Sequence, residues 1–250
     1  MMEPVKGITK GGTGYSLYAD LLYVPDAEPL QDLDVYIPDG PAPKSGWPGV
    51  IYVHGGGFTA GDKADKGRGF EHALMALDNG FAMISANYRL PGRAPEQIEV
   101  ELSDVQAALR YIVTNAGQWG LDSKKIAYLG VSAGGALVCA AAARASKEGE
   151  PPVFAVISVA SATDFTKAGD YVDQSTPPFY IIHGTADSIV KISQAESFAA
   201  SLDAAGVSYV FDSVEGGEHT RPVDHPNTMT LLEEQGRLND AYTWLKGLLA

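Results

Sequence analysis

The strongest candidate for a nucleophile is a serine between two glycines, in the segment Gly130-Val131-Ser132-Ala133-Gly134. This segment directly follows an apolar run typical of a strand and begins an alanine-rich run typical of a helix, so the serine hydroxyl would project from a tight strand-to-helix turn. The glycines let neighbouring backbone approach without a clash with a Cβ atom, and the start of the helix favours negative charge nearby. The pattern predicts an activated serine and acyl transfer through a covalent intermediate.

A second segment, residues 54–58 (His-Gly-Gly-Gly-Phe), follows another apolar run. Three consecutive glycines allow backbone N–H groups to point into one small volume, where they would stabilise the negative charge on a carbonyl oxygen that a serine attacks. The N–H group of Ala133, next to Ser132, would be a further donor. Loss of one such donor typically costs about 3–4 kcal/mol, so this segment predicts an oxyanion hole.

The serine needs a base, and the chain has five histidines. His54 lies in the glycine segment, where we expect it to brace the loop. His183 ends an apolar strand, where a hydrogen-bonded structural role is expected, and His72 falls in an expected surface helix. His219 and His225 remain as candidates. His219 is favoured because it follows a Gly-rich stretch past the last expected strand, and such a loop can carry an imidazole over the edge of the sheet.

The third member of such a site is a carboxylate that orients the imidazole and stabilises its cation. Asp187 follows the expected strand 179–182, and Asp164, after the preceding strand, is the alternative. Glu218 places another carboxylate beside His219, where it would either make the imidazole more basic or face solvent.

The remaining sequence supplies the elements that must position these residues. Short apolar runs alternate with longer runs of helical period, which indicates a parallel sheet covered by helices on both faces. Residues 32–37 alternate with period two and predict a half-exposed strand. The other expected strands are residues 17–24, 50–53, 81–86, 126–131, 153–160, 179–182 and 207–211. The expected helices are residues 98–112, 133–145, 193–205 and 228–249.

Taken in chain order, these segments make the sequence resemble an α/β-hydrolase, close to the carboxylesterases with an HGGG loop and to small bacterial feruloyl-esterase-like proteins. The resemblance implies a mostly parallel central sheet flanked by helices, and the hydrolysis of carboxylic esters. It rests on six segments, which are residues 33–38, 54–58, 87–90, 104–108, 130–135 and 183–187.

The same resemblance implies roles for individual residues. Ser132 would be the nucleophile, His219 the general base and Asp187 its partner, in the chain order usual for this fold. In this type of loop the second and third glycines are the usual donors. The implied oxyanion hole is therefore made of Gly56, Gly57 and Ala133.

Two features bear on the substrate. Residues 91–96 lack the proline-phenylalanine pattern usual before the long helix, so the wall of the entrance differs from the family pattern. Only about 18 residues separate two consecutive strands where larger relatives insert a cap, so we expect one domain over residues 1–250 with an open cleft and no cap. Such a cleft favours short-chain or aryl esters. The candidates to line it are Phe58, Phe165, Tyr171 and Ile189.

The amino-acid composition excludes some classes of binding partner. The chain has 250 residues, with 18 basic and 31 acidic side chains and a net charge of −13. This charge repels nucleic acids and anionic lipid, and it would disfavour anionic substrates wherever it borders the cleft. The expected partner is a small ester, without nucleic acid or membrane, and the oligomeric state stays open.

The single cysteine, Cys139, excludes an internal disulfide and a Cys-based zinc site, and we expect it to be a buried apolar residue. The proposed reaction needs no cofactor and no metal. No apolar run reaches the roughly 20 residues that span a bilayer, and residues 1–14 do not resemble an intact signal peptide. We therefore expect a cytoplasmic protein, with a secreted protein that has lost its signal peptide as the alternative.

Two other functions fit parts of the pattern. An arylformamidase or small amidase would use the same serine, histidine and aspartate on a different bond. A non-catalytic ligand-binding protein on a hydrolase scaffold would commonly lack one of the three residues, whereas this sequence has a candidate for each.

Overall fold

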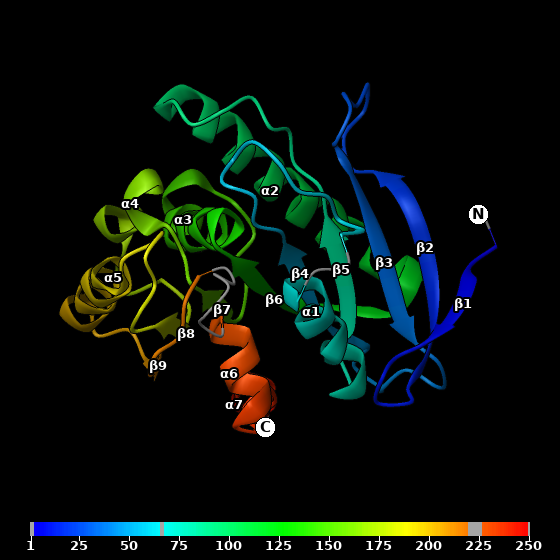
Figure 1. The fold of residues 1–250 in the computed structure, drawn as a ribbon. Coiled ribbons are helices and arrows are strands. Elements are labelled where there is room, and N and C mark those ends of the chain that lie inside the picture. The colour runs from blue at the N-terminus through cyan, green and yellow to red at the C-terminus, as the bar shows by residue number, and fades with distance from the viewer. Residues whose placement is uncertain (1–2, 66–67, 220–226, 250) are drawn as a thin grey trace.

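A mixed β-sheet runs through the residues that the computed structural model describes, which are 3–65, 68–219 and 227–249. Its strands are β1 (Val5–Ile8), β2 (Gly14–Leu22), β3 (Asp32–Pro38), β4 (Trp47–Val53), β5 (Ala82–Ala86), β6 (Leu121–Val131), β7 (Val156–Val159), β8 (Phe179–Gly184) and β9 (Tyr209–Val214). They lie in the order β1-β2-β3-β5-β4-β6-β7-β8-β9 (Figure 1). The β1–β2, β2–β3 and β3–β5 pairs are antiparallel, and every other pair is parallel.

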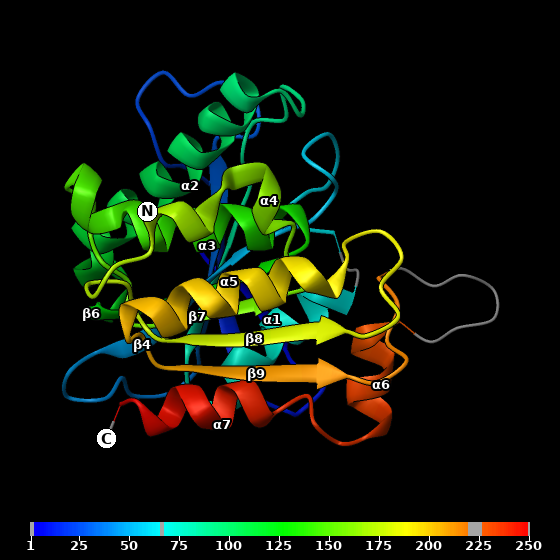
Figure 2. The ribbon, with the colours of Figure 1, turned by 90° about the vertical axis from the view of Figure 1, so that its left-hand side faces the viewer.

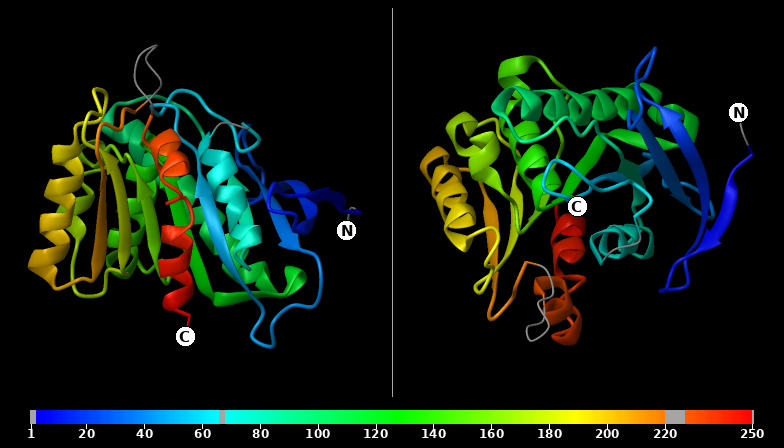
Figure 3. Two further views of the ribbon diagram at one scale, coloured as in Figure 1. Left: turned by 60° about the horizontal axis from the view of Figure 1, so that its bottom comes forward. Right: turned by 45° about the horizontal axis from the view of Figure 1, so that its top comes forward.

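Helices cover both faces of this sheet. The α-helices are α1 (Arg68–Asp78), α2 (Pro95–Asn115), α3 (Ala133–Glu148), α4 (Thr163–Thr166), α5 (Ile192–Ala205), α6 (Thr228–Glu234) and α7 (Asp240–Gly247). Short 3-10 turns form η1 (Ala116–Trp119) and η2 (Ala168–Tyr171). The helices α2, α3 and α5 pack on one face, and α1, α6 and α7 pack on the other. Figure 2 looks onto the β8–β9 edge between α5 and α7, and the left view of Figure 3 shows α1, α6 and α7 together.

The central strands are apolar on both sides because they separate two cores. In β5, Ile84 packs in the core beneath α2 and α3, whereas its neighbour Met83 packs in the core beneath α1 and α7. Ile51 and Val50 of β4 divide in the same way, as alternating side chains of a strand must. The prediction of a parallel sheet covered on both faces is confirmed.

Parallel strands bring distant parts of the sequence to one edge of the sheet. The segments that follow β4, β6, β8 and β9 all leave from the carboxyl ends of parallel strands. In open α/β sheets this edge is where ligands bind. It carries residues 54–58, Ser132, Asp187 and His219.

The prediction that residues 32–37 form a half-exposed strand is wrong. Four of the seven residues of β3 in succession are buried, and Asp34 is only 4% exposed. The Nζ atom of Lys63, itself buried, lies 2.7 Å from Asp34 Oδ1 and 3.3 Å from Asp32 Oδ2. The two aspartates of the strand therefore contact the buried Lys63 ammonium group instead of water. Such pairing offsets the free-energy cost of burying charged groups.

The end of the chain also differs from expectation. Residues 228–249 form two helices, α6 and α7, instead of one. The break contains Gly236, whose φ of +68° lies in the left-handed region that commonly ends a helix. The short edge strand β1 has mostly exposed residues and therefore had no apolar pattern to reveal it.

The connection between β7 and β8 contains only α4 and η2. This confirms the expectation that no cap domain is inserted there. In the described part of the chain, no helix combines the length and the apolarity that crossing a bilayer requires.

Candidate active site

Ser132 occupies the turn between β6 and α3 with φ 57° and ψ −118°, a conformation that an L-residue rarely adopts. Strain of this kind costs of order 1–3 kcal/mol and persists only where the surroundings enforce it. Here the Ser132 N–H group donates to the carbonyl of Val159 at 2.9 Å, and its own carbonyl accepts from the amides of Ala136 and Ala162 at 3.0 and 3.2 Å. The backbone on both sides of the turn is thereby fixed, and the side chain is held at the edge of the sheet.

The glycine loop after β4 packs directly against this turn. A Cβ atom at Gly134 would lie 2.3 Å from the carbonyl oxygens of Val53 and His54, so only glycine fits there. A Cβ atom at Gly55 would lie 3.2 Å from the Cβ atom of Ser132. The two segments singled out in the sequence are therefore immediate neighbours.

The structure brings the serine, a histidine and an aspartate into one hydrogen-bonded series. Ser132 Oγ lies 2.9 Å from Nε2 of His219, and Nδ1 of His219 lies 2.7 Å from Oδ2 of Asp187. An ionised carboxylate only accepts hydrogen bonds, so Nδ1 carries the imidazole proton and Nε2 is left to accept from the serine hydroxyl. The alternative base, His225, lies outside the described residues. The alternative acid, Asp164, is exposed in α4 and donates its backbone N–H to Gln194.

Asp187 is held by more than its histidine partner. Its Oδ1 atom accepts from the amides of Ile189 at 3.0 Å and Val190 at 2.8 Å. Burial alone would raise the pKa of Asp187, but hydrogen bonds from His183, His219 and the Val190 amide hold this pKa well below its usual range. The carboxylate is therefore ionised at neutral pH.

His183 is buried, and its Nε2 atom lies 2.8 Å from the carbonyl oxygen of Val190 and 3.4 Å from Asp187 Oδ2. The prediction of a hydrogen-bonded structural histidine is confirmed. The sequence did not predict that His183 lies close to the Asp187 carboxylate. The two residues come together because the turn after β8 brings Asp187 back toward the end of that strand.

Glu218 does not face solvent as one sequence interpretation had it, because it is only 8% exposed. Its Oε2 atom accepts from the amide and the hydroxyl of Ser188, at 3.0 and 2.9 Å, and from the amide of His219 at 3.3 Å. The hydrogen bond from the Ser188 amide is the main reason that the pKa of Glu218 lies below its usual value. Glu218 thus ties the loop that carries the histidine to the loop that carries Asp187.

His54 braces the glycine loop, as expected. Its ring is buried and stacks on Tyr88 with centroids 4.5 Å apart, and its Nδ1 atom lies 2.7 Å from the carbonyl oxygen of Gly55. The Tyr88 hydroxyl donates to the His54 carbonyl at 2.9 Å. Burial lowers the pKa of His54, so the ring acts as an uncharged brace.

The loop itself has an unusual backbone. Gly56, Gly57 and Phe58 have φ values of +127°, +61° and +65°, and a Cβ atom at Gly56 would lie 1.8 Å from the carbonyl oxygen of Ala60. Among the described residues, nothing accepts a hydrogen bond from the amides of Gly56, Gly57 or Ala133. These three N–H groups thus have no hydrogen-bond partner within the described part of the chain.

Three of the four apolar residues suggested by the sequence lie on segments next to this series. Phe58 is buried directly after the glycines, and its ring centroid is 5.4 Å from that of Phe165. Phe165 is 50% exposed, and Ile189, two residues after Asp187, is 61% exposed. Phe165 and Ile189 thus belong to the exposed large apolar side chains of the described residues.

Tyr171 lies elsewhere. Its ring centroid is 4.7 Å from the guanidinium carbon of Arg144, and Arg144 is 12 residues along α3 from Ser132, which is about 18 Å of helix. The expectation that Tyr171 lines the cleft has no support in this geometry. Tyr171 ends η2, in the connection between β7 and β8, and this turn packs beside α3.

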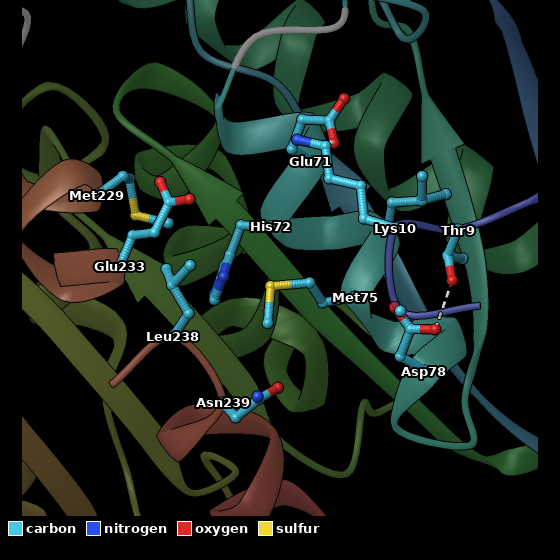
Figure 4. A pocket seen from close by; sticks show the side chains of 12 residues that line it. Thr9, Lys10, Glu71, His72, Met75, Asp78, Met229, Glu233, Leu238 and Asn239 are labelled. Atoms are coloured by element: carbon cyan, nitrogen blue, oxygen red, sulfur yellow. Dashed lines mark hydrogen bonds and ion pairs between the residues drawn. The ribbon is translucent and has the colours of Figure 1, made fainter. Parts of the chain in front are cut away.

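A separate cavity of about 640 Å³ lies between α1, the loop after β1 and the α6–α7 segment (Figure 4). The described residues that line it include none of the hydrogen-bonded series. His72 lies on its inner side and is 2% exposed, so the expectation of a surface histidine is wrong. The ring is covered because it packs against Tyr242, with centroids 5.4 Å apart, and this burial lowers its pKa to about 4.

Comparison with known proteins agrees with this geometry. The family description BD-FAE matches residues 33–168 and 155–202. Esterase LipC of Mycobacterium tuberculosis is 27% identical over 257 aligned positions, which cover 79% of this chain and 61% of LipC. The first three curated relatives are matched over 32%, 61% and 44% of their own length, so the chain spans less than two thirds of each.

Two solved structures resemble the whole fold. A truncated carbohydrate esterase from gut microbiota superposes with a TM-score of 0.77 at 20% identity, over 99% of both chains. MGS-M1, an α/β hydrolase from a deep-sea metagenome library of the Medee basin, superposes with a TM-score of 0.73 at 22% identity, over 94% of this chain and 98% of its own. These likenesses confirm the predicted α/β-hydrolase fold.

Proposed function

This chain belongs to the BD-FAE family, and from that premise we propose that it is a serine esterase that hydrolyses small carboxylic esters through an acyl-enzyme on Ser132. The observation that carries the proposal is the hydrogen-bonded series from Ser132 through His219 to Asp187, beside three backbone amides with no acceptor among the described residues. Similarity to proteins named as esterases supports the same reaction class.

In the first half of the reaction, Nε2 of His219 takes the proton of Ser132 as Oγ forms a bond to the ester carbonyl carbon. The carbonyl oxygen becomes negatively charged and accepts hydrogen bonds from the amides of Gly56, Gly57 and Ala133. When the intermediate collapses, the bond to the alcohol oxygen breaks and the imidazolium returns the proton to that oxygen. The alcohol leaves, and the acyl group stays on the serine.

In the second half, His219 takes a proton from water as the water oxygen attacks the acyl carbon. The bond to Oγ breaks, the proton returns to the serine and the carboxylic acid is released. Asp187 stays ionised throughout. It fixes the imidazole in the tautomer that presents Nε2 to the serine, and its charge stabilises the imidazolium that forms twice in each cycle.

The open edge of the sheet supports a small substrate. The β7–β8 connection contains only α4 and η2, so nothing there forms an apolar lid that would shield a long acyl chain. Phe165 and Ile189 instead offer limited, exposed apolar contacts. We propose short-chain or aryl esters as substrates, hydrolysed by one domain built on the single sheet.

A p-nitrophenyl ester series from acetate to palmitate, extended with methyl ferulate and an aryl formamide, tests this function. We expect kcat/KM to be highest for the short or aryl esters and hydrolysis to be lost in Ser132→Ala. If the wild type hydrolyses none of the esters, the proposal is wrong. A clear preference for the formamide would make the protein an amidase that uses the same residues, and a clear preference for palmitate would contradict the argument from the open edge.

A further inference from the structure

Arg93, on the segment that leads into α2, lies directly on the proposed oxyanion loop. Its Nε–H group donates to the carbonyl oxygen of Gly57 at 2.7 Å. A Cβ atom at Gly57 would lie 2.7 Å from Nη2 and 3.5 Å from Cζ of Arg93, so the guanidinium covers the Cα atom of this glycine. Gly55, two residues earlier, contacts Ser132, and two residues of backbone span at most about 7 Å. The cation therefore lies on the same short loop that packs against the nucleophile.

Arg93 differs from the other described arginines in having no carboxylate partner among the residues that the structure describes. Among the arginine side chains that the structure describes, each of the other four has an acidic oxygen within 4.0 Å; these four are Arg89, Arg110, Arg144 and Arg237. Arg93 is exposed, and within the described residues its side chain donates a hydrogen bond to the carbonyl of Gly57. Arg93 is therefore the exception among the described arginines, although the chain has 31 acidic and only 18 basic side chains.

The segment that carries Arg93 is fixed before any ligand arrives. The side chain of Gln97 accepts from the amide of Ala94 at 2.9 Å and donates to the carbonyl of Pro91 at 2.8 Å. The first turn of α2 adds the positive end of a long helix. Its one acidic side chain, Glu96, makes no ion pair with Arg93 among the described contacts.

The chemistry of the guanidinium indicates what would bind. With Nε committed to Gly57, the two Nη atoms still present four N–H groups in one plane, a geometry that matches the two oxygens of a carboxylate. Resting on the proposed function, we propose that Arg93 forms an anionic subsite of this esterase and that the preferred ester carries a carboxylate on its acyl or its alcohol part. The attraction of a carboxylate to the nearby guanidinium thus outweighs its repulsion by the net charge of −13 of the chain.

The test uses pairs of substrates that differ only in charge. On the acyl side these are mono-p-nitrophenyl succinate and its neutral isostere p-nitrophenyl isocaproate. On the alcohol side they are p-acetoxybenzoate and p-acetoxybenzamide. The measured quantity is the ratio of kcat/KM for the anionic ester to kcat/KM for its neutral partner, corrected for hydrolysis without enzyme. Substituting Arg93 removes its hydrogen bond to the Gly57 carbonyl and would lower kcat/KM for both esters of a pair. The ratio cancels this shared loss.

We expect Arg93→Gln to lower this ratio in at least one pair by roughly 10-fold to 100-fold, the size typical of a hydrogen-bonded charge pair. Arg93→Lys retains the charge and should keep part of the preference. Arg110→Gln removes the same charge from the surface far along α2 and should leave the ratio as it is in the wild type. Added salt should reduce the wild-type ratio.

The proposal is overturned if Arg93→Gln leaves both ratios unchanged, since Arg93 would then only brace the loop. It is equally overturned if Arg110→Gln lowers the ratios as much, because net charge would then explain the effect. Failure of the proposed esterase function would look different: the wild type would hydrolyse neither member of either pair.

Discussion

At the scale of single residues, the site depends on residues that hydrogen bonds hold in one conformation. Ser132 is held in a rare backbone conformation by three main-chain hydrogen bonds, and Asp187 accepts from two amides besides its histidine partner. The sequence predicted these residues because serine, histidine and aspartate carry recognisable chemistry. It did not predict the supporting role of Glu218, because its contact with Ser188 joins loops 30 residues apart.

One buried residue should make stability depend on pH. Glu101 in α2 is fully buried, and burial raises its pKa from 4.5 to about 8. Between these pH values the folded protein keeps a proton that the unfolded chain has released. The free energy of unfolding should therefore fall as pH rises from 5 to 8, with this residue contributing at most about 1.4 kcal/mol per pH unit.

The check is urea unfolding at several pH values for the wild type, Glu101→Gln and Glu96→Gln, which changes an exposed glutamate of the same helix. Glu101→Gln should flatten the decline in unfolding free energy between pH 5 and 8, and Glu96→Gln should not. If the wild type and Glu101→Gln lose stability in parallel over this range, Glu101 does not titrate as described.

At the scale of elements, the loop after β4, the turn after β6 and the start of α3 form one closely packed unit. Periodicity in the sequence was enough to predict the central strands and most helices, because these are buried on both faces or amphipathic. It was insufficient for β3, where Lys63 covers the polar side of the strand, and for the α6–α7 break at Gly236. The burial of β3 is decided by a long-range contact, and the α6–α7 break is decided by a local backbone conformation. The hydrophobic pattern of the sequence encodes neither.

Substituting a single glycine tests this packing. Gly134→Ala would place a Cβ atom 2.3 Å from two carbonyl oxygens of the neighbouring loop, so we expect an unfolding free energy lower by about 1–3 kcal/mol together with a strong loss of ester hydrolysis. Gly117→Ala is the matched control, because its Cβ atom would meet nothing within 4 Å. It should be neutral or slightly stabilising. Equal effects of the two substitutions in thermal unfolding would contradict this account of the unit.

At the scale of the whole molecule, the fold explains why residues 54, 132, 187 and 219 meet. Each follows a parallel strand, and all these strands end at one edge of the sheet. This convergence was predictable from the order of strands and helices alone. The placement of other side chains was not predictable in this way. Tyr171 lies beside Arg144, His72 is buried, and Arg93 contacts the proposed oxyanion loop from a segment that had no recognisable motif. Such contacts depend on the paths of loops, which local sequence does not determine.

The most direct test of the central claim is covalent labelling of the protein with a p-nitrophenyl alkylphosphonate, which mimics the tetrahedral intermediate of ester hydrolysis. Intact-mass and peptide mass spectrometry should find one phosphonyl group per chain, attached to Ser132, with ester hydrolysis lost in proportion to labelling. Asp187→Asn should label far more slowly, because an amide stabilises the wrong imidazole tautomer and typically costs about 10⁴-fold in rate. Labelling at another residue, or full ester hydrolysis by Ser132→Ala, would contradict the account.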